Sequence, residues 1–206
     1  MPRITAIVPH RNLNDLLPRS IRSIREQTIS GDIEIIVVDN HSDVKPEVGN
    51  DTILLVSDTD MGLAYSMNRG YLEASSPYCA MVCADDTIEP GWFETALGYL
   101  ESDPSIQFVS PDSRGELCWP QILYENTQHM GAVFRRQLIL NTPYANVDFY
   151  DWDLWCRLAA KGTRGISLSA HAYNWNWREG SLRTETCEKG IYEKLALELR
   201  ERYLTT

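Results

Sequence analysis

Residues Tyr78–Pro90, YCAMVCADDTIEP, indicate the class of fold. An apolar run from Tyr78 to Ala84 leads directly into two adjacent carboxylates, Asp85 and Asp86, and the stretch ends at Pro90, a residue suited to the first turn of a helix. A short apolar run between turn signals predicts an interior strand. The two aspartates then lie at the carboxyl end of that strand, which is where ligands bind in open α/β sheets.

Strand and helix patterns alternate around this stretch. Because apolar residues recur at strand or helix spacing, we expect strands at 3–9, 33–38, 52–57, 78–84 and 106–110 and helices near 17–24, 61–72 and 90–100. Asn14 or Asp15 is the expected cap of the first helix. Strands alternating with helices of this length predict βαβ units, an α/β fold and a mostly parallel central sheet flanked by helices.

The pattern changes after Pro111. Residues 112–128 are irregular and predict a loop or hairpin that covers a site. Beyond them we expect strands at 131–134 and 166–169 and helices at 136–140, 151–161 and 188–203. Since no linker or repeat interrupts the chain, we expect one domain over residues 1–206, with a nucleotide-binding half of about 1–111 and an acceptor and catalytic half of about 112–206.

Composition limits the partners and the compartment. The chain has 206 residues and a net charge of -10, from 19 basic and 29 acidic side chains, which argues against a broad nucleic-acid footprint. No transmembrane segment or signal peptide is recognisable, so we expect a soluble, cytoplasmic protein. Five cysteines without a CxxC pair are typical of reduced thiols, and the four histidines lack zinc-ligand spacing to them.

Asp85 and Asp86 are candidates for a metal site. Adjacent carboxylates at a strand end hold Mg²⁺ or Mn²⁺ and leave positions open for phosphates. The alternative is a solvated acidic turn that caps the next helix. Asp39, at the end of the strand 33–38, favours the metal site. Because no glycine-rich phosphate loop is present, a nucleotide diphosphate needs a metal and side chains such as His10, Arg11 and Arg69.

Five segments together resemble a known family. They are ITAIVPHRN (4–12), IEIIVVDNHSD (33–43), MGLAYSMNRGYLEA (61–74), YCAMVCADDTIEPGWFETAL (78–97) and FYDWDLWCRLAAKG (149–162). Their order and spacing resemble the inverting, metal-dependent nucleotide-sugar glycosyltransferases of family two, which have the GT-A fold. The resemblance runs from residue 4 to about residue 183.

The resemblance implies roles for individual residues. Pro9 lies in the segment that lines the nucleobase pocket, and Asp39 corresponds to the acid that hydrogen-bonds the base. Asp85 and Asp86 correspond to the motif that contacts the ribose and binds the metal. Asp151 corresponds to the general base that takes the proton from the acceptor hydroxyl.

Three positions depart from the family pattern. Cys83 stands where the first acid of the aspartate motif is common, and Met67 stands where an arginine is common, with Arg69 displaced by two residues. Arg178 stands where a metal-binding histidine is often found, so that His171 or no histidine completes the metal site.

Asp151 also has a purely structural reading. As an N-cap it would contribute roughly 1 kcal/mol to helix stability without any catalytic role. A helix amino terminus also favours the ionised carboxylate, so capping and catalysis are compatible. Asp153 is about 200° further round the helix and cannot serve the same site equally.

Aromatic residues of the second half are candidates for sugar or acceptor contacts. We interpret Tyr173, Trp175 and Trp177 as packing, and Trp119 and Tyr124 as possible contacts to the acceptor.

The expected function is inverting transfer of a sugar from a nucleoside-diphosphate sugar, linked to UDP, dTDP or GDP, to a hydroxyl of a glycan, a protein or another acceptor. Mn²⁺ or Mg²⁺ assists, and Asp151 is the base. One alternative is a nucleotide-sugar or glycan-binding module without turnover. Another is a nucleotidyltransferase, which the missing glycine-rich phosphate loop disfavours.

Overall fold

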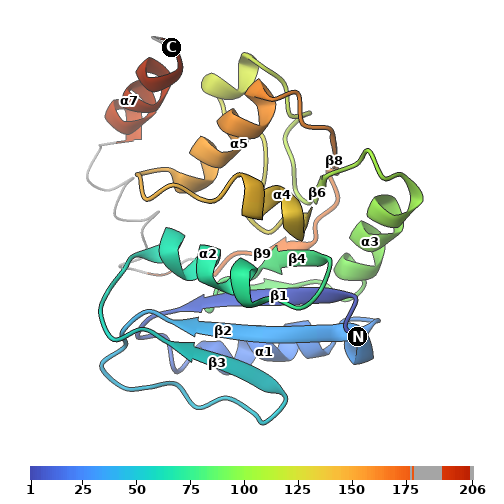
Figure 1. Cartoon of the computed structure of the whole chain (residues 1–206), viewed down its shortest axis with the longest axis vertical. Helices are drawn as coiled ribbons and strands as arrows, with labels where there is room; N and C mark the ends of the chain where they lie inside the picture. Colours follow the sequence, from blue (N-terminus) through green and yellow to red (C-terminus); the bar gives the residue numbers. More distant parts are fainter. Residues whose placement is uncertain (177, 179–191, 205–206) are drawn as a thin grey trace.

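A computed structural model describes residues 1–176, 178 and 192–204. Its centre is a seven-stranded sheet in the order β3-β2-β1-β4-β7-β6-β8 (Figure 1). The strands of this sheet are β1 Ile4–His10, β2 Ile33–Asp39, β3 Thr52–Val56, β4 Tyr78–Met81, β6 Phe108–Ser110, β7 Val133–Arg135 and β8 Gly165–Ser167. Among these strands only β7 runs antiparallel to its neighbours, β4 and β6. The predicted mostly parallel α/β sheet is confirmed.

Helices cover both faces of this sheet (Figure 1). The described helices are α1 Leu17–Arg25, α2 Leu63–Glu73, α3 Trp92–Ser102, α4 Arg136–Asn141, α5 Tyr150–Ala160 and α7 Tyr192–Leu204, with short 3-10 turns η1 Ser30–Asp32 and η2 Gln121–Leu123. Apolar side chains of α1 and α3 pack in one buried cluster, and those of α2, α4, α5 and α7 pack in a second. None of the described helices is both long and apolar enough to cross a bilayer.

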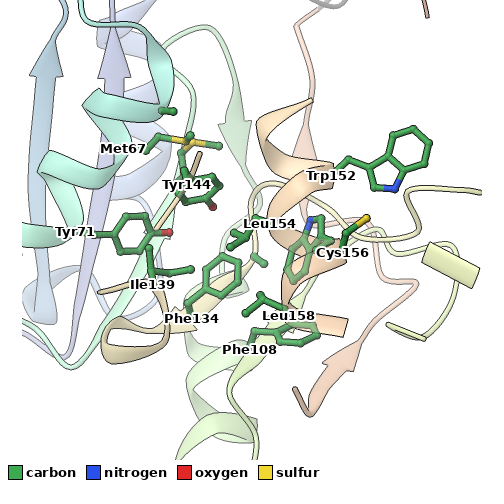
Figure 2. Close-up of a cluster of buried hydrophobic side chains, with 14 of the residues drawn as sticks. Met67, Tyr71, Phe108, Phe134, Ile139, Tyr144, Trp152, Leu154, Cys156 and Leu158 are labelled. Atoms are coloured by element: carbon green, nitrogen blue, oxygen red, sulfur yellow. The ribbon is translucent and has the colours of Figure 1, made fainter. Parts of the chain in front are cut away.

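The second cluster joins the two halves of the chain. Figure 2 shows Met67 and Tyr71 of α2 on one side of this cluster and Leu154 and Leu158 of α5 on the other, with Phe134 of β7 between them. All five side chains are at most 1% exposed. The helix that carries Asp151 is therefore fixed against the sheet by apolar burial, at roughly 1.5–3 kcal/mol for each large side chain.

Two local predictions were wrong at element ends. Strand β4 ends at Met81, and the chain then turns, with the Asp86 amide donating to the Cys83 carbonyl at 3.1 Å. Helix α1 has Leu16 as its N-cap, without a side-chain cap bond. Asn14 does not cap it, because its amide donates to the Val44 carbonyl instead.

The turn after β4 is held by a second, two-stranded sheet. Strand β5, Thr87–Ile88, pairs antiparallel with β9, Tyr173–Asn174. This pairing brings a segment about 85 residues further along the chain against Asp85 and Asp86. The pairing of β5 with β9 thus holds the loop that carries the two aspartates.

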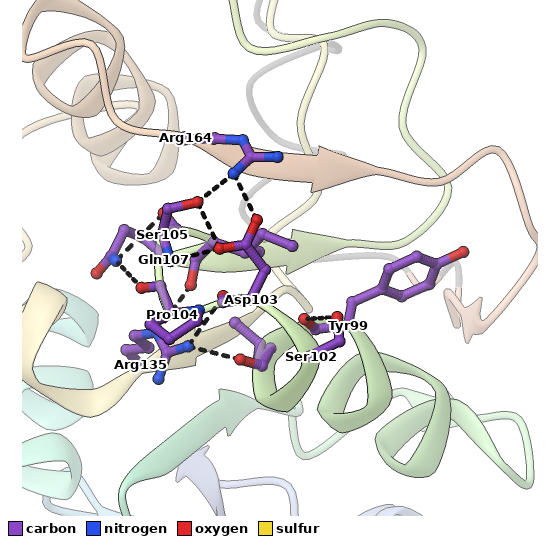
Figure 3. A network of polar contacts seen from close by, with 10 residues as sticks. Tyr99, Ser102, Asp103, Pro104, Ser105, Gln107, Arg135 and Arg164 are labelled. Atoms are coloured by element: carbon purple, nitrogen blue, oxygen red, sulfur yellow. Dashed lines mark hydrogen bonds and ion pairs between the residues drawn. The ribbon is translucent and has the colours of Figure 1, made fainter.

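The loop between α3 and β6 has its own polar network (Figure 3). Asp103 accepts from the amide and hydroxyl of Ser105 at 2.9 and 2.7 Å and from Arg164 at 2.6 Å. These hydrogen bonds, those of Ser105 first, lower the pKa of Asp103 to about 2. Arg135 donates to the Leu100 carbonyl at the end of α3, which satisfies a helix C-terminus. The network lies at the amino end of β6, away from Asp85 and Asp86.

Helix α7 is anchored on α5 through a buried carboxylate. Asp153 is 2% exposed and accepts from Arg157 at 2.8 Å, from Arg202 at 2.9 Å and from the Tyr203 hydroxyl at 2.7 Å. The predicted terminal helix is confirmed from Tyr192 onward, and residues 188–191 lie outside the described residues.

A matched pair of glycine substitutions tests the packing of α2 on the sheet. A Cβ at Gly70 would lie 2.3 Å from Ile7 Cγ2, whereas one at Gly98, on the exposed face of α3, would meet nothing within 4 Å. We expect Gly70→Ala to lower the free energy of unfolding by about 1–3 kcal/mol despite the better helix propensity of alanine. Gly98→Ala should raise it by about 0.5–1 kcal/mol. Urea unfolding measures both, and a stabilised Gly70→Ala would contradict the close approach of α2 to β1.

Candidate active site

A cavity of about 920 Å³ opens where the carboxyl ends of β1, β2 and β4 converge. This is a size typical of ligand sites. Both halves of the chain line it. The lining includes Pro9, His10, Arg11, Asn40, Asp60, Asp85 and Asp86 from the first half, and Asn126, His129, Phe149, Tyr150, Asp151, Trp175, Arg178 and Tyr192 from the second.

Asp86 is held by two donors from the segment at β9. The Tyr173 hydroxyl donates to Oδ2 at 3.0 Å, and the Asn176 amide donates to Oδ1 at 2.8 Å. Tyr173 also accepts from the Cys83 amide at 2.9 Å. A Cβ at Gly131 would lie 2.3 Å from the Tyr173 ring, so glycine is needed for this ring to reach the loop. The interpretation of Tyr173 as packing was therefore incomplete.

The loop raises the pKa values of its acidic groups. Burial, and then the neighbouring charge of Asp85, raise the pKa of Asp86 from 3.8 to about 6, although the bonds from Asn176 and Tyr173 oppose the shift. Burial, followed by the charges of Asp86 and Asp85, raises the pKa of the Cys83 thiol well above its ordinary value. Cys83 is therefore a neutral thiol at neutral pH.

The residues present fit a hard divalent cation. Ligand atoms of Cys83, Asp85 and Asp86 lie within 4.8 Å of one another. Each carboxylate oxygen has two lone pairs, so the bonds from Tyr173 and Asn176 leave the oxygens of Asp86 with capacity for a metal. Carboxylates suit Mg²⁺ and Mn²⁺, whereas a neutral thiol does not. Asp85 and Asp86 are thus the candidate metal ligands, and Cys83 is a neighbour.

Asp85 is paired with Arg178. The guanidinium Nε donates to Oδ2 at 2.7 Å, and both side chains line the cavity. Arg178, which departs from the family pattern, thus contacts one member of the acid pair directly.

Asp151 reaches the cavity from α5. The structural alternative, in which Asp151 is the N-cap of this helix, was wrong: Phe149 is the N-cap, in the left-handed conformation with φ of 53°, and the helix begins at Tyr150. This turn leaves Asp151 in the first helical turn, where Asn126 donates to its Oδ2 at 3.1 Å. Asp153 points elsewhere, into the anchor of α7, as its position round the helix predicts.

The predicted base-binding residues form two layers. Pro9, His10 and Arg11 line the cavity. Asp39 is 1% exposed and lies behind them, accepting from His10 Nδ1 at 2.9 Å and from the Ser42 hydroxyl. Asp39 therefore lies behind the cavity lining, in contact with His10.

Other predicted site residues lie outside this cavity. Arg69 donates to the Val56 carbonyl at 2.8 Å, and His171 contacts Asn174 and Asp112 instead of the acid pair. Trp119 packs edge-on against Tyr203, and Tyr124 lies under Arg200. Trp177 lies outside the described residues.

The sequence patterns missed several lining residues. His129 is 7% exposed, packs on Tyr173 at 4.6 Å between ring centroids and contacts the Trp175 indole. Asn126 and Tyr192 also line the cavity. None lies at the end of a predicted strand or in a recognised segment, so only the folded chain brings them to the site.

Curated relatives match either nearly all or about half of the chain. A glycosyltransferase of PGL/p-HBAD biosynthesis from Mycobacterium tuberculosis is 32% identical over 97% of this chain and 86% of its own length. A glucosyl-dolichyl phosphate glucuronosyltransferase from Haloferax volcanii is 30% identical over 44% of this chain and 31% of its own length.

Solved structures share the fold. The TarS 1-349 structure from S. aureus in complex with UDP-GlcNAc has a TM-score of 0.73 at 18% identity, over 88% of this chain and 60% of that chain. The mannosyltransferase PcManGT from Pyrobaculum calidifontis, with GDP-Man and Mn²⁺, has a TM-score of 0.65 at 24% identity, over 81% of this chain and 54% of that chain. This chain thus spans less than two thirds of those structures and has the GT-A fold that they represent.

The family model described as glycosyl transferase family 2 matches residues 5–152, a range that contains all of β1 but its first residue, both aspartates of the acid loop and Asp151. With the relative at 32% identity over nearly the whole chain, this match identifies the protein as a member of glycosyl transferase family 2.

Proposed function

We propose that the chain transfers a sugar from a nucleoside-diphosphate sugar to an acceptor hydroxyl with inversion at the anomeric carbon. One observation carries the proposal: Asp151 of α5 lines the same cavity as Asp85 and Asp86. In this proposal residues up to about 111 bind the donor, and residues from about 112 supply the base and the acceptor site.

The reaction is a single displacement. The acceptor oxygen attacks the anomeric carbon from the face opposite the leaving group. The bond from that carbon to the diphosphate oxygen breaks, and its electron pair stays on the diphosphate. Asp151 accepts the proton of the acceptor hydroxyl, and Asn126 orients the Asp151 carboxylate through its hydrogen bond at 3.1 Å.

Asp85 and Asp86 would hold Mn²⁺ or Mg²⁺, which offsets the negative charge that grows on the leaving diphosphate. Tyr173 and the Asn176 amide orient Asp86 for this role. His10, backed by Asp39, and Pro9 bind the nucleobase side of the donor. Arg11 also lines this side, where it is paired with Asp60.

The titles of the structural neighbours support this donor class, since TarS is described with UDP-GlcNAc and PcManGT with GDP-Man and Mn²⁺. UDP, dTDP and GDP remain the bases to compare. The acceptor hydroxyl belongs to a glycan, a protein or another molecule that enters beside Asp151.

Asp151→Asn tests the base. We expect turnover to fall by about 10²–10⁴-fold, the usual contribution of a general base, while metal-dependent nucleotide binding is retained. Asp148→Asn is the matched control, because Asp148 lines the same cavity three residues earlier. Release of nucleoside diphosphate measures turnover. Full activity in Asp151→Asn would remove Asp151 from this role.

Thermal unfolding with nucleotides tests the donor site. We expect UDP, dTDP or GDP to raise the melting temperature more with Mn²⁺ than with EDTA. At a hundredfold excess over Kd, the nucleotide raises the free energy of unfolding by about 2.7 kcal/mol. In a chain of this size, each kcal/mol raises the melting temperature by about 2–4 °C. If none of the three nucleotides raises the melting temperature in the presence of Mn²⁺, a nucleotide-sugar donor is contradicted. Binding without any turnover would favour a non-catalytic module.

The pKa of Asp86 gives a pH dependence for metal binding. A proton competes with the cation, and the folded protein holds that proton with a pKa of about 6. The site is ionised above this pH, so the affinity for Mn²⁺ should be level above pH 7 and should fall up to about tenfold per pH unit well below pH 6. Titration of free Mn²⁺ by electron paramagnetic resonance between pH 5 and 8 measures it. Unchanged affinity at pH 5 would exclude Asp86 as a ligand.

A further inference from the structure

We propose that Arg178 is a fixed cation of the donor site, which binds the diphosphate of the donor and opposes the divalent cation at Asp85. This inference rests on the proposed function and extends it to a residue with no assigned role. It predicts opposite changes in the affinities for metal and for nucleotide when Arg178 is replaced.

The contact to Asp85 is close and partly shielded from water. Arg178 Nε lies 2.7 Å from Asp85 Oδ2, and the exposed fractions of the two side chains are 32% and 15%. Coulomb energies between charges near a protein surface are several times those in bulk water. The charge of Arg178 is therefore felt strongly by any ion at Asp85 and Asp86.

The chemistry of a guanidinium defines what it can bind. It carries five N–H donors, has no lone pair for a metal and remains protonated at physiological pH. It therefore cannot join Asp85 and Asp86 as a metal ligand. Its planar fork matches two oxygens of a phosphate, so an anion is its natural ligand.

The charges of the loop favour the same assignment. Asp85 and Asp86 together balance one divalent cation, and Arg178 then leaves a net positive charge at the acid pair. That charge suits a diphosphate, whose negative charge increases as the sugar leaves. The same positive charge repels the divalent cation when no nucleotide is bound.

Other contacts besides that of Arg178 attach this segment to the acid loop. Tyr173 and the Asn176 amide tie the same segment to Asp86, and β5 pairs with β9. Loss of Arg178 therefore leaves the acid loop attached. This separation makes the effect of its charge measurable.

The test compares Arg178→Ala, Arg178→Lys and Arg114→Ala in the full chain. Arg114 lines the same cavity, and its side chain is 68% exposed, with Glu125 at 3.8 Å as an ion-pair partner. Its replacement removes the same charge from the cavity rim without touching Asp85. Mn²⁺ binding is measured without nucleotide by electron paramagnetic resonance, and UDP and GDP binding is measured in EDTA by calorimetry. Thermal unfolding of each variant checks folding.

We expect Arg178→Ala to bind Mn²⁺ about tenfold more tightly and the better nucleoside diphosphate about tenfold more weakly, as expected for one charge at this range. Arg178→Lys keeps the charge, so its Mn²⁺ affinity should stay near that of the parent, while nucleotide binding weakens because an ammonium lacks the fork. Arg114→Ala should leave both affinities within about twofold, as for an exposed charge.

Several results would overturn the inference. Both affinities falling together in Arg178→Ala, with a lower melting temperature, would make Arg178 structural. Unchanged affinities, or equal changes in Arg114→Ala, would show that its charge has no specific role. If the parent chain binds no nucleoside diphosphate with or without Mn²⁺, the proposed function fails as well. If replacement of Arg178 leaves nucleotide binding unchanged, only this inference is rejected.

Discussion

The hydroxyl of Tyr173 holds the acid loop in place. It donates to Asp86 and accepts from the Cys83 amide, so one side chain from β9 fixes two residues of the loop after β4. The β5 and β9 pairing brings this ring to the loop, and Gly131 leaves room for it. The second half of the chain thus supplies both this contact to the acid loop and, on α5, Asp151.

The buried position of Asp86 lowers the free energy of unfolding when its carboxyl is ionised. A carboxyl whose pKa is raised from 3.8 to about 6 binds more protons in the folded than in the unfolded state between these pH values. The folded state is thus penalised as pH rises through that window, by about 3 kcal/mol once Asp86 is ionised. That is a large share of the roughly 5–15 kcal/mol that stabilises a typical domain. An acid kept under such a penalty is expected to have a ligand that needs its charge.

Local patterns were sufficient for the sheet and for part of the site. Runs such as residues 33–38 predict buried parallel strands, and the residues after two such runs, His10 and Asp85, meet at one edge of the sheet. Contacts between residues far apart in sequence were not predictable. Arg178 on Asp85 and Tyr173 on Asp86 join residues 93 and 87 positions apart, and no periodicity records such pairs. The resemblance implied that Asp39 hydrogen-bonds the base, whereas in the structure it is buried and accepts hydrogen bonds from His10 and Ser42.

The central claim is that the acid pair and Asp151 serve one reaction in one cavity. Crystals grown with Mn²⁺ and an intact, slowly transferred UDP- or GDP-sugar test it most directly, with anomalous diffraction to locate the manganese. We predict manganese between the diphosphate and the carboxylates of Asp85 and Asp86, with the anomeric carbon open toward Asp151. Manganese bound elsewhere, or a sugar whose open face points away from Asp151, would contradict the account.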